Sequence, residues 1–157
     1  MRPTFYKNGV QGVSFGNQVK VVEPVNLYGC EIHDEVFIGP FVEIQKDVVI
    51  GSRTKIQSHS FICELVTIGT DCFIGHGVMF INDLFVNGGP ARGDKSLWKG
   101  TKVGNNVSIG SNATILSTYI CDGSVVGAGA VVTKDIVSPG VYVGNPATLI
   151  KNFSRVG

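Results

Sequence analysis

Five polar side chains between residues 59 and 83 have the types and the spacing to do chemistry. They are His59, Glu64, His76, Asn82 and Asp83. An imidazole titrates near neutral pH, so it can take a proton from an attacking group. Carboxylate and amide groups beside it can hold the amine or hydroxyl that attacks. The group therefore predicts a site at which a small polar acceptor is bound and made ready to react.

Each of these residues also has a purely structural interpretation. His59 could be a corner histidine bonded to a backbone carbonyl, and His76 lies between two glycines, where it could be a plain turn residue. Asn82 and Asp83 suit the capping of a turn in the segment that follows them. Glu64 could simply solvate a surface. Both interpretations stay open from the sequence.

The elements that must position these side chains follow a period of six residues. An α-helix would repeat every 3.6 residues and an amphipathic strand every 2, so a hexad is one short strand plus a turn. Three hexads make one triangular coil of eighteen residues, and stacked coils bury their aliphatic side chains in a common interior. The period predicts an all-β fold, a parallel β-helix of about six triangular coils. Nine consecutive apolar positions carry it: Ile32, Ile38, Ile44, Ile50, Ile56, Ile62, Ile68, Ile74 and Phe80.

Changes of phase divide the chain. An apolar set before residue 32 is one residue out of phase with the main set and contains Val13, Val19 and Val25. The six-residue period resumes after residue 102, at Val103, Ile109, Ile115, Cys121, Gly127 and Thr133. We expect one domain, with a lead-in over 1–12, coils over 13–80, a protruding loop over 81–102, coils over 103–147 and a tail over 148–157. Long loops on rigid scaffolds often carry function.

The coil length also predicts which residues are neighbours. Residues eighteen apart should stack, which puts Glu64 over Asn82 and His59 over Gly77, beside His76. From this we expect the five polar side chains to gather near the point where the loop leaves the prism.

Composition excludes several classes of protein. The 157 residues carry 13 basic and 12 acidic side chains, a formal net charge of +1, which argues against a nucleic-acid-binding face. No secretory signal and no apolar stretch long enough to span a bilayer is present, which favours a cytoplasmic protein. Because the four cysteines form no CxxC pair, we expect free, buried thiols. They are Cys30, Cys63, Cys72 and Cys121.

Three segments carry a resemblance to a known family: VVGAGAVVTKDI at 125–136 with GNPA at 144–147, KIQSHSFICELVTIG at 55–69 and CFIGHGVMFIND at 72–83. With the hexads, they resemble the left-handed β-helix acyltransferases, the hexapeptide-repeat family. The last two are similar to bacterial N-acetyltransferases that act on the 3-amino group of a nucleotide-linked deoxyhexose for surface polysaccharides such as lipopolysaccharide. The resemblance implies left-handed coils, a homotrimer with sites in clefts between prisms, acetyl-CoA as co-substrate, and an acceptor linked to dTDP or UDP.

Roles for the individual residues follow from their types and spacing, and for Asn82 and Asp83 the role is the one that the resemblance implies. His59 is the preferred general base or amine-binding residue, Asn82 and Asp83 would hold the sugar amine or a neighbouring hydroxyl, Glu64 would accept a sugar hydroxyl, and His76 would bond the base or the thioester oxygen. Phe85 and Trp98 would stack on the nucleobase or pack against a neighbouring subunit. The residues implied for coenzyme A are Gly127, Ala128, Gly129 and Ala130 along the pantetheine arm, Asn145, and Lys134, Lys151 or Arg155 at the phosphates. Thr148 stands where many relatives carry Lys or Arg.

Three alternatives remain. A carbonic anhydrase on the same fold would need a three-histidine metal site with two histidines five residues apart, whereas the three here lie 26 and 17 residues apart. We therefore expect no metal. A non-catalytic β-helix scaffold would need neither a small-residue groove nor a polar cluster beside the loop. An O-acetyltransferase acting on a hydroxyl would need a true base more than an N-acetyltransferase does.

Overall fold

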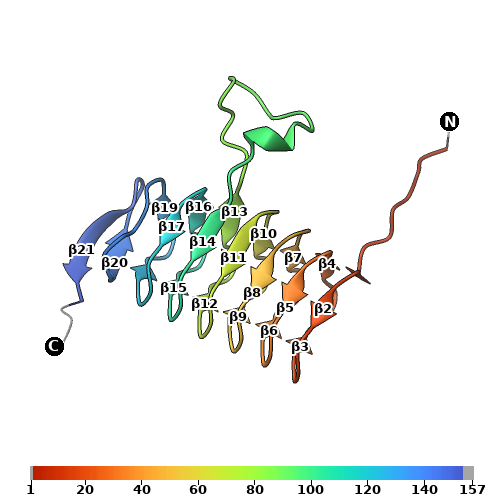
Figure 1. Cartoon of the computed structure of the whole chain (residues 1–157), viewed down its shortest axis with the longest axis horizontal. Coiled ribbons are helices and arrows are strands. Elements are labelled where there is room, and N and C mark those ends of the chain that lie inside the picture. The colour runs from red at the N-terminus through yellow and green to blue at the C-terminus, as the bar shows by residue number, and fades with distance from the viewer. Residues whose placement is uncertain (1, 154–157) are drawn as a thin grey trace.

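The computed structural model describes residues 2–153, and it shows a parallel β-helix: a triangular prism of short strands with one loop standing out from it (Figure 1). Each coil passes through three sheets in turn. The first sheet contains β1 (Val10–Gln11), β4 (Asn26–Tyr28), β7 (Glu43–Ile44), β10 (Phe61–Ile62), β13 (Met79–Ile81), β16 (Thr114–Leu116) and β19 (Val131–Val132). These seven strands give about seven coils, one more than the period suggested, because β1 already pairs with β4.

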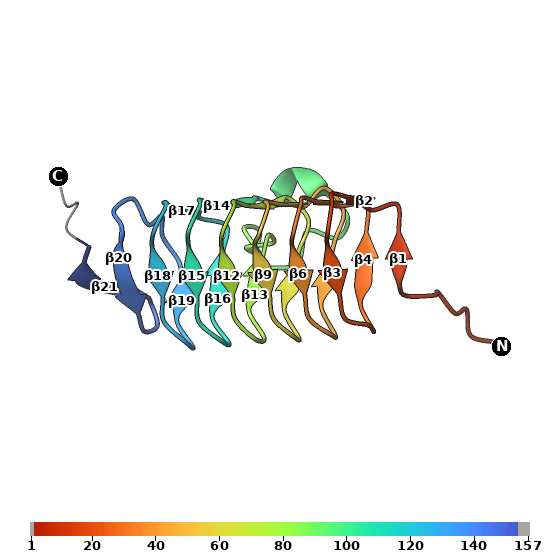
Figure 2. The ribbon, with the colours of Figure 1, turned by 90° about the horizontal axis from the view of Figure 1, so that it is seen from below.

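The other two sheets complete the prism. The second contains β2 (Ser14–Phe15), β5 (Glu31–Ile32), β8 (Val49–Ile50), β11 (Val66–Ile68), β14 (Thr101–Val103) and β17 (Tyr119–Ile120). The third contains β3 (Lys20–Val21), β6 (Phe37–Ile38), β9 (Lys55–Ile56), β12 (Phe73–Ile74), β15 (Ser108–Ile109), β18 (Val125–Val126), β20 (Gly140–Val143) and β21 (Thr148–Asn152). Figure 2 shows the strands of the third sheet side by side along the prism. All pairs are parallel except β20–β21, an antiparallel hairpin at the C-terminal end.

The interior of the prism is the stack of aliphatic side chains that the hexads predict. The isoleucines of the repeat, from Ile32 to Ile74, are all buried, with Phe80 in line behind them. After the loop the predicted inward residues Val103, Ile109 and Ile115 are confirmed, and from Cys121 onward the prediction is wrong by one position. Ile120, Val126 and Val132 point inward in place of Cys121, Gly127 and Thr133.

This shift has a simple cause in the length of the coils. Strand partners lie 18 residues apart in the middle of the prism, as in Phe61 and Met79, but 17 apart at both ends, as in Leu27 and Ile44 or Thr114 and Val131. The lost residue always comes from the turn between the first and second sheets. The same turn accepts the long loop, so this edge of the prism is the one whose length varies.

We name the three edges by what they carry. The loop edge joins the first sheet to the second and includes residues 63–65 and the loop over 82–100, with the short 3-10 helix η1 (Lys95–Leu97). The middle edge joins the second sheet to the third. The histidine edge joins the third sheet to the first and includes residues 57–60, 75–78, 110–113 and 127–130. In residues 2–153 no helix is long and apolar enough to cross a bilayer.

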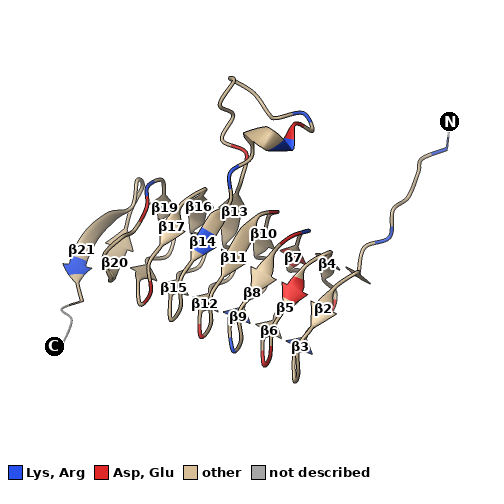
Figure 3. Cartoon of the chain, viewed as in Figure 1, with Lys and Arg blue, Asp and Glu red and all other residues tan. Residues whose placement is uncertain are grey.

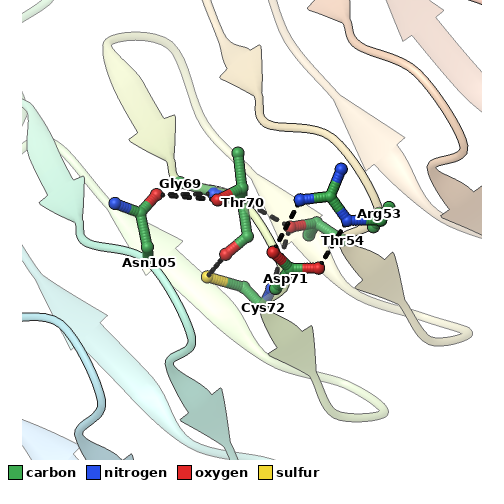
Figure 4. A network of polar contacts seen from close by, with 7 residues as sticks. All are labelled: Arg53, Thr54, Gly69, Thr70, Asp71, Cys72 and Asn105. Carbon is green, nitrogen blue, oxygen red and sulfur yellow. Dashed lines mark hydrogen bonds and ion pairs between the residues drawn. The ribbon is translucent and has the colours of Figure 1, made fainter.

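The middle edge is a structural seam whose polar groups satisfy one another (Figure 4). The Thr54 hydroxyl donates to the carbonyl of Gly69 at 2.8 Å and accepts from the backbone N–H of Cys72 at 3.0 Å, so it joins one coil to the next. Arg53 donates two bonds of 2.7 Å to the Asp71 carboxylate, and this contact lowers the pKa of Asp71. Because these groups are already paired, the middle edge offers little to a ligand.

Candidate functional site

The loop is held in shape by one carboxylate of its own and is tied to the prism by one hydroxyl. Asp83 accepts the N–H of Ala91 at 2.7 Å and that of Phe85 at 3.1 Å, and these two bonds lower its pKa. The buried Ser117 hydroxyl contacts the carbonyl of Lys99, on the returning arm of the loop, at 2.7 Å, and that of Ile81, at the end of β13, at 3.2 Å. The Asp83 carboxylate is thus engaged by the loop itself, as a turn cap would be.

Glu64 and Asn82 meet at the foot of this loop, as the eighteen-residue stacking predicts. The Asn82 side-chain amide donates to the Glu64 carbonyl at 3.2 Å, and the Asn82 carbonyl accepts the N–H of Lys99 at 2.9 Å. The Glu64 carboxylate lies 2.6 Å from the Lys95 ammonium group, which also stands 5.2 Å from the centre of the Trp98 ring. Lys95 belongs to no repeat, so no periodic signal in the sequence marks it as part of this group.

The two aromatic residues of the loop differ in their surroundings. Trp98 is half-buried, pairs with Asp83 through a backbone bridge, and has a buried indole N–H without a hydrogen-bond partner. Phe85 is 59% exposed in a run with the exposed Leu84 and Val86. Figure 3 shows charges of both signs on the loop and along the prism. The loop therefore carries exposed apolar area at Leu84, Phe85 and Val86 together with charges of both signs.

The two histidines lie on the histidine edge, away from the loop. His59 has a left-handed backbone, φ 64°, as Gly77 has in the next coil, and its ring stacks on Phe41 with 4.9 Å between centroids. His76 is exposed, and its Nδ1 lies 3.5 Å from the Ser111 hydroxyl, which also accepts the His76 backbone N–H at 3.2 Å. Ser111 lies in the coil next to that of His76, but it follows His76 by 35 residues because the loop lengthens the chain between them. A spacing of eighteen residues therefore did not predict this contact.

The prediction that the five side chains gather at the loop is therefore wrong for a single chain. Glu64, Asn82 and Asp83 lie together at the loop edge, whereas His59 and His76 lie across the first sheet from them. The physical reason is that residues about six apart sit on successive corners of a triangular coil. One face of the prism separates them, about 15 Å at about 3.3 Å per strand residue.

The residues implied for coenzyme A continue the histidine edge toward the C-terminus. Gly127, Ala128, Gly129 and Ala130 form the turn between β18 and β19, and the exposed Asn145 lies in the turn after β20. Gly129 has φ +68°, and a Cβ added there would meet no atom within 4 Å. Its N–H donates to the carbonyl of Ser111 at 2.9 Å, one coil back. Gly127, Ala128 and Gly129 leave this stretch of edge small and open, two coils beyond His76, whereas Ala130 is fully buried in the core.

The basic residues implied for the phosphates are not gathered there. Lys134 is exposed on the turn after β19, at the loop edge, and Lys151 is exposed on β21, at the end of the third sheet. Arg155 lies outside the described residues. Over residues 2–153 no group of three His, Cys, Asp or Glu side chains is arranged to hold a metal ion.

The four cysteines are buried and free. Burial raises the pKa of Cys30 to about 11 and that of Cys63 to about 12, and it also raises the pKa of Cys72. Because the thiolate is the reactive form, these three side chains act as core residues and not as nucleophiles.

Comparison with known sequences matches the repeats of this chain to two repeat families. The bacterial transferase hexapeptide family (six repeats) matches residues 29–64, and the hexapeptide repeat of succinyl-transferase matches residues 100–134. Serine acetyltransferase 2 of Arabidopsis thaliana is 38% identical over 88 residues, 55% of this chain and 26% of that protein. A probable macrolide acetyltransferase of Lysinibacillus sphaericus is 32% identical over 117 residues, 59% of this chain and 63% of that protein. The chain spans about a quarter of the length of the first curated relatives it matches.

Solved structures share the architecture. A hexapeptide-repeat acetyltransferase of Vibrio cholerae O1 biovar eltor, complexed with acetyl coenzyme A, superposes with a TM-score of 0.65 at 24% identity, over 79% of this chain and 70% of that one. A mutant of perosamine N-acetyltransferase from Caulobacter crescentus, complexed with CoA and GDP-perosamine, gives 0.61 at 18% identity, over 92% of this chain and 58% of that one. At these identities the likeness shows the fold.

Proposed function

We propose, because its repeats match two hexapeptide-repeat transferase families, that this chain is an acetyl-CoA-dependent N-acetyltransferase. Its acceptor would be the amino group, in particular a 3-amino group, of a nucleotide-linked deoxy amino sugar made for surface polysaccharides. Relatives named as acetyltransferases, and a structural neighbour solved with GDP-perosamine, support the reaction and the acceptor class. A cytoplasmic location is part of the same proposal.

One observation carries the proposal: the small, open turn of Gly127, Ala128 and Gly129 lies on the same edge as His76. Glycine and alanine let a ligand lie close to the backbone, and the vacant space at Gly129 suits a pantetheine arm. Acetyl-CoA bound along this edge supplies the thioester. Strands stack about 4.8 Å apart, so His76 is about 10 Å, two coils, from the Ala128 position.

The chemistry asks for a neutral amine held against the thioester carbonyl. The amine gains the acetyl group and loses one proton, and the coenzyme A sulfur gains a proton as it leaves. His76 and His59 both remain candidates for the base that takes the amine's proton. His76 has the better support, because it is one coil nearer to Gly129 and is oriented by Ser111. Loss of all activity in His59→Ala would favour His59, and would lean toward a hydroxyl acceptor.

Two chains would have to share each site. The acceptor-binding side chains Glu64 and Asn82 and the histidine edge lie on opposite sides of the first sheet, so one chain does not bring them together. A ring of three copies, in which the loop edge of one subunit meets the histidine edge of the next, would do so. The exposed apolar loop residues Phe85 and Leu84 and the outward Met79 would then be covered by a neighbour.

Mixing two inactive variants tests the shared site. Glu64→Gln damages only the loop edge and His76→Ala only the histidine edge. Random mixing after reversible dissociation should restore about a quarter of the sites in a head-to-tail ring, since each site then draws its two edges independently. Recovery of no activity from the mixture, with wild-type subunits recovering fully after the same treatment, would refute the shared site.

The reaction is tested by following release of the CoA thiol from acetyl-CoA. The acceptors are thymidine- and uridine-linked 3-amino and 4-amino hexoses, with simple sugars as controls. Release with a 3-amino sugar nucleotide alone supports the proposal and identifies the nucleobase. Release with simple sugars would move the function to O-acetylation. No release with any acceptor, together with no acetyl-CoA binding by calorimetry, would leave a scaffold role.

A further inference from the structure

The contact between Lys95 and Glu64 has the form of a ligand in a site. The Lys95 ammonium nitrogen lies 2.6 Å from a Glu64 carboxylate oxygen and 5.2 Å from the centre of the Trp98 ring. The Glu64 side chain is only 13% exposed, whereas that of Lys95 is 56% exposed. A well-sheltered carboxylate and an aromatic face thus converge on a cation that arrives from the solvent side.

These two groups are those that recognise an ammonium ion. A carboxylate binds it through charge-assisted hydrogen bonds, and the electron-rich face of an indole attracts it electrostatically. A neutral hydroxyl gains far less from either group. The position of the pair, at the foot of the loop beside Asn82, is also where the acceptor is expected.

Both groups are held in place, whereas the lysine is not. The Glu64 backbone is tied to Asn82 on one side and to the Gln45 side chain on the other. Trp98 is fixed by its backbone bridge to Asp83, whose carboxylate in turn anchors the loop. The Lys95 side chain has a long flexible stem, and an ion pair with so exposed a partner contributes little to stability. It can therefore leave at small cost.

We propose that Glu64 and Trp98 form the ammonium subsite for the acceptor, and that Lys95 occupies this subsite in the free protein until the acceptor's amine displaces it. The inference rests on the proposed function, because it takes the acceptor to be an amino sugar. After the bound amine loses a proton, a remaining N–H can still donate to Glu64. The lysine makes the subsite selective, since only a competing cation gains enough to replace it.

The test compares two acceptors that differ in one group. Thymidine- and uridine-linked 3-amino hexoses and their 3-hydroxy counterparts are titrated by calorimetry into the wild type, Lys95→Gln and Glu64→Gln. Lys102→Gln is the matched control, because Lys102 is an exposed lysine on β14 whose neighbours across the sheet are Thr67 and Tyr119. Removing the competitor should tighten binding of the amino sugar about two- to fivefold and leave the hydroxy sugar unchanged. Glu64→Gln should weaken the amino sugar alone, and the control should alter neither.

Three results would overturn the inference. Weaker binding of both sugars to Lys95→Gln would mean that Lys95 contacts the nucleotide phosphates instead. Equal binding of the two sugars by the wild type would mean that no ammonium subsite exists, whereas no binding of either would refute the proposed acceptor and the subsite with it. Thiol release is measured separately, so normal release with unchanged binding in Lys95→Gln would reject the subsite and leave the proposed acetyl transfer standing.

Discussion

Replacing Gly129 with alanine should obstruct acetyl-CoA while costing the fold little, and Gly123 provides a matched control. The two glycines have nearly the same backbone, φ +68° and φ +70°, and a Cβ at either would meet no atom within 4 Å. Each donates its N–H to a carbonyl one coil back, at 2.9 Å. They differ in place, because Gly129 lies on the histidine edge and Gly123 on the middle edge.

The size of each effect follows from this geometry. Alanine in a left-handed conformation costs about 1–2 kcal/mol, so both variants should unfold at a temperature about 2–8 °C below that of the wild type. A methyl group in the path of the pantetheine arm overpacks the contact by about 1–3 kcal/mol, which weakens acetyl-CoA binding by about 5- to 150-fold. Only Gly129→Ala should show this second effect.

Calorimetric titration with acetyl-CoA and thermal unfolding of the three proteins measure the two effects separately. The reasoning predicts equal losses of stability and unequal losses of affinity. If both variants bind acetyl-CoA as the wild type does, the cofactor does not pass over Gly129, and the histidine edge loses its assigned role.

Four further outcomes are expected. Thr54→Val should lower the free energy of unfolding by about 2–4 kcal/mol, because it leaves a buried carbonyl and a buried N–H unpaired; Thr54→Ser, which keeps the hydroxyl, should cost about 1 kcal/mol, and equal costs in urea unfolding would contradict the seam described. Asp83→Asn should speed amide exchange at Ala91. The pKa of Asp83 is lower in the folded protein than in the unfolded chain, where it is near 3.8. The carboxylate therefore stabilises the loop above pH 3.8, and this stabilisation is lost as the pH falls through the folded pKa. A difference in exchange between Asp83→Asn and the wild type that persists at about pH 2 would refute this role of the carboxylate. Cys63, with a pKa near 12, should resist iodoacetamide at pH 8 until the protein unfolds, and rapid native labelling at that residue would contradict its burial. Ile74→Ala should lower the free energy of unfolding by about 2–5 kcal/mol, and a smaller loss would show that the coil collapses around the gap.

The structure also changes how the candidate site is interpreted. Spacing correctly placed Glu64 against Asn82, since eighteen residues is the coil length there. The same spacing placed His59 level with Gly77, and both do share one position of the turn. The prediction failed where it joined these two stacks into one site. Glu64 and His59 are only five residues apart in the sequence, but they lie on different corners of the coil. Nearness in sequence is a poor guide in a solenoid, where one hexad turns the chain through a third of a circle.

The six-residue repeat is enough to predict the fold and most of the side chains that fill its interior. A six-residue period admits few arrangements that bury every sixth side chain, so the parallel β-helix followed from Ile32 to Phe80 alone. The positions of the loop residues, in contrast, could not be predicted without the folded structure. Lys95, Trp98 and Asp83 follow no period, and their contacts with Glu64 and with the loop backbone depend on how a 19-residue excursion over 82–100 folds back on the prism. The shortened turns likewise became visible only in the paired strands, because a one-residue deletion at a corner leaves the hexads on either side intact.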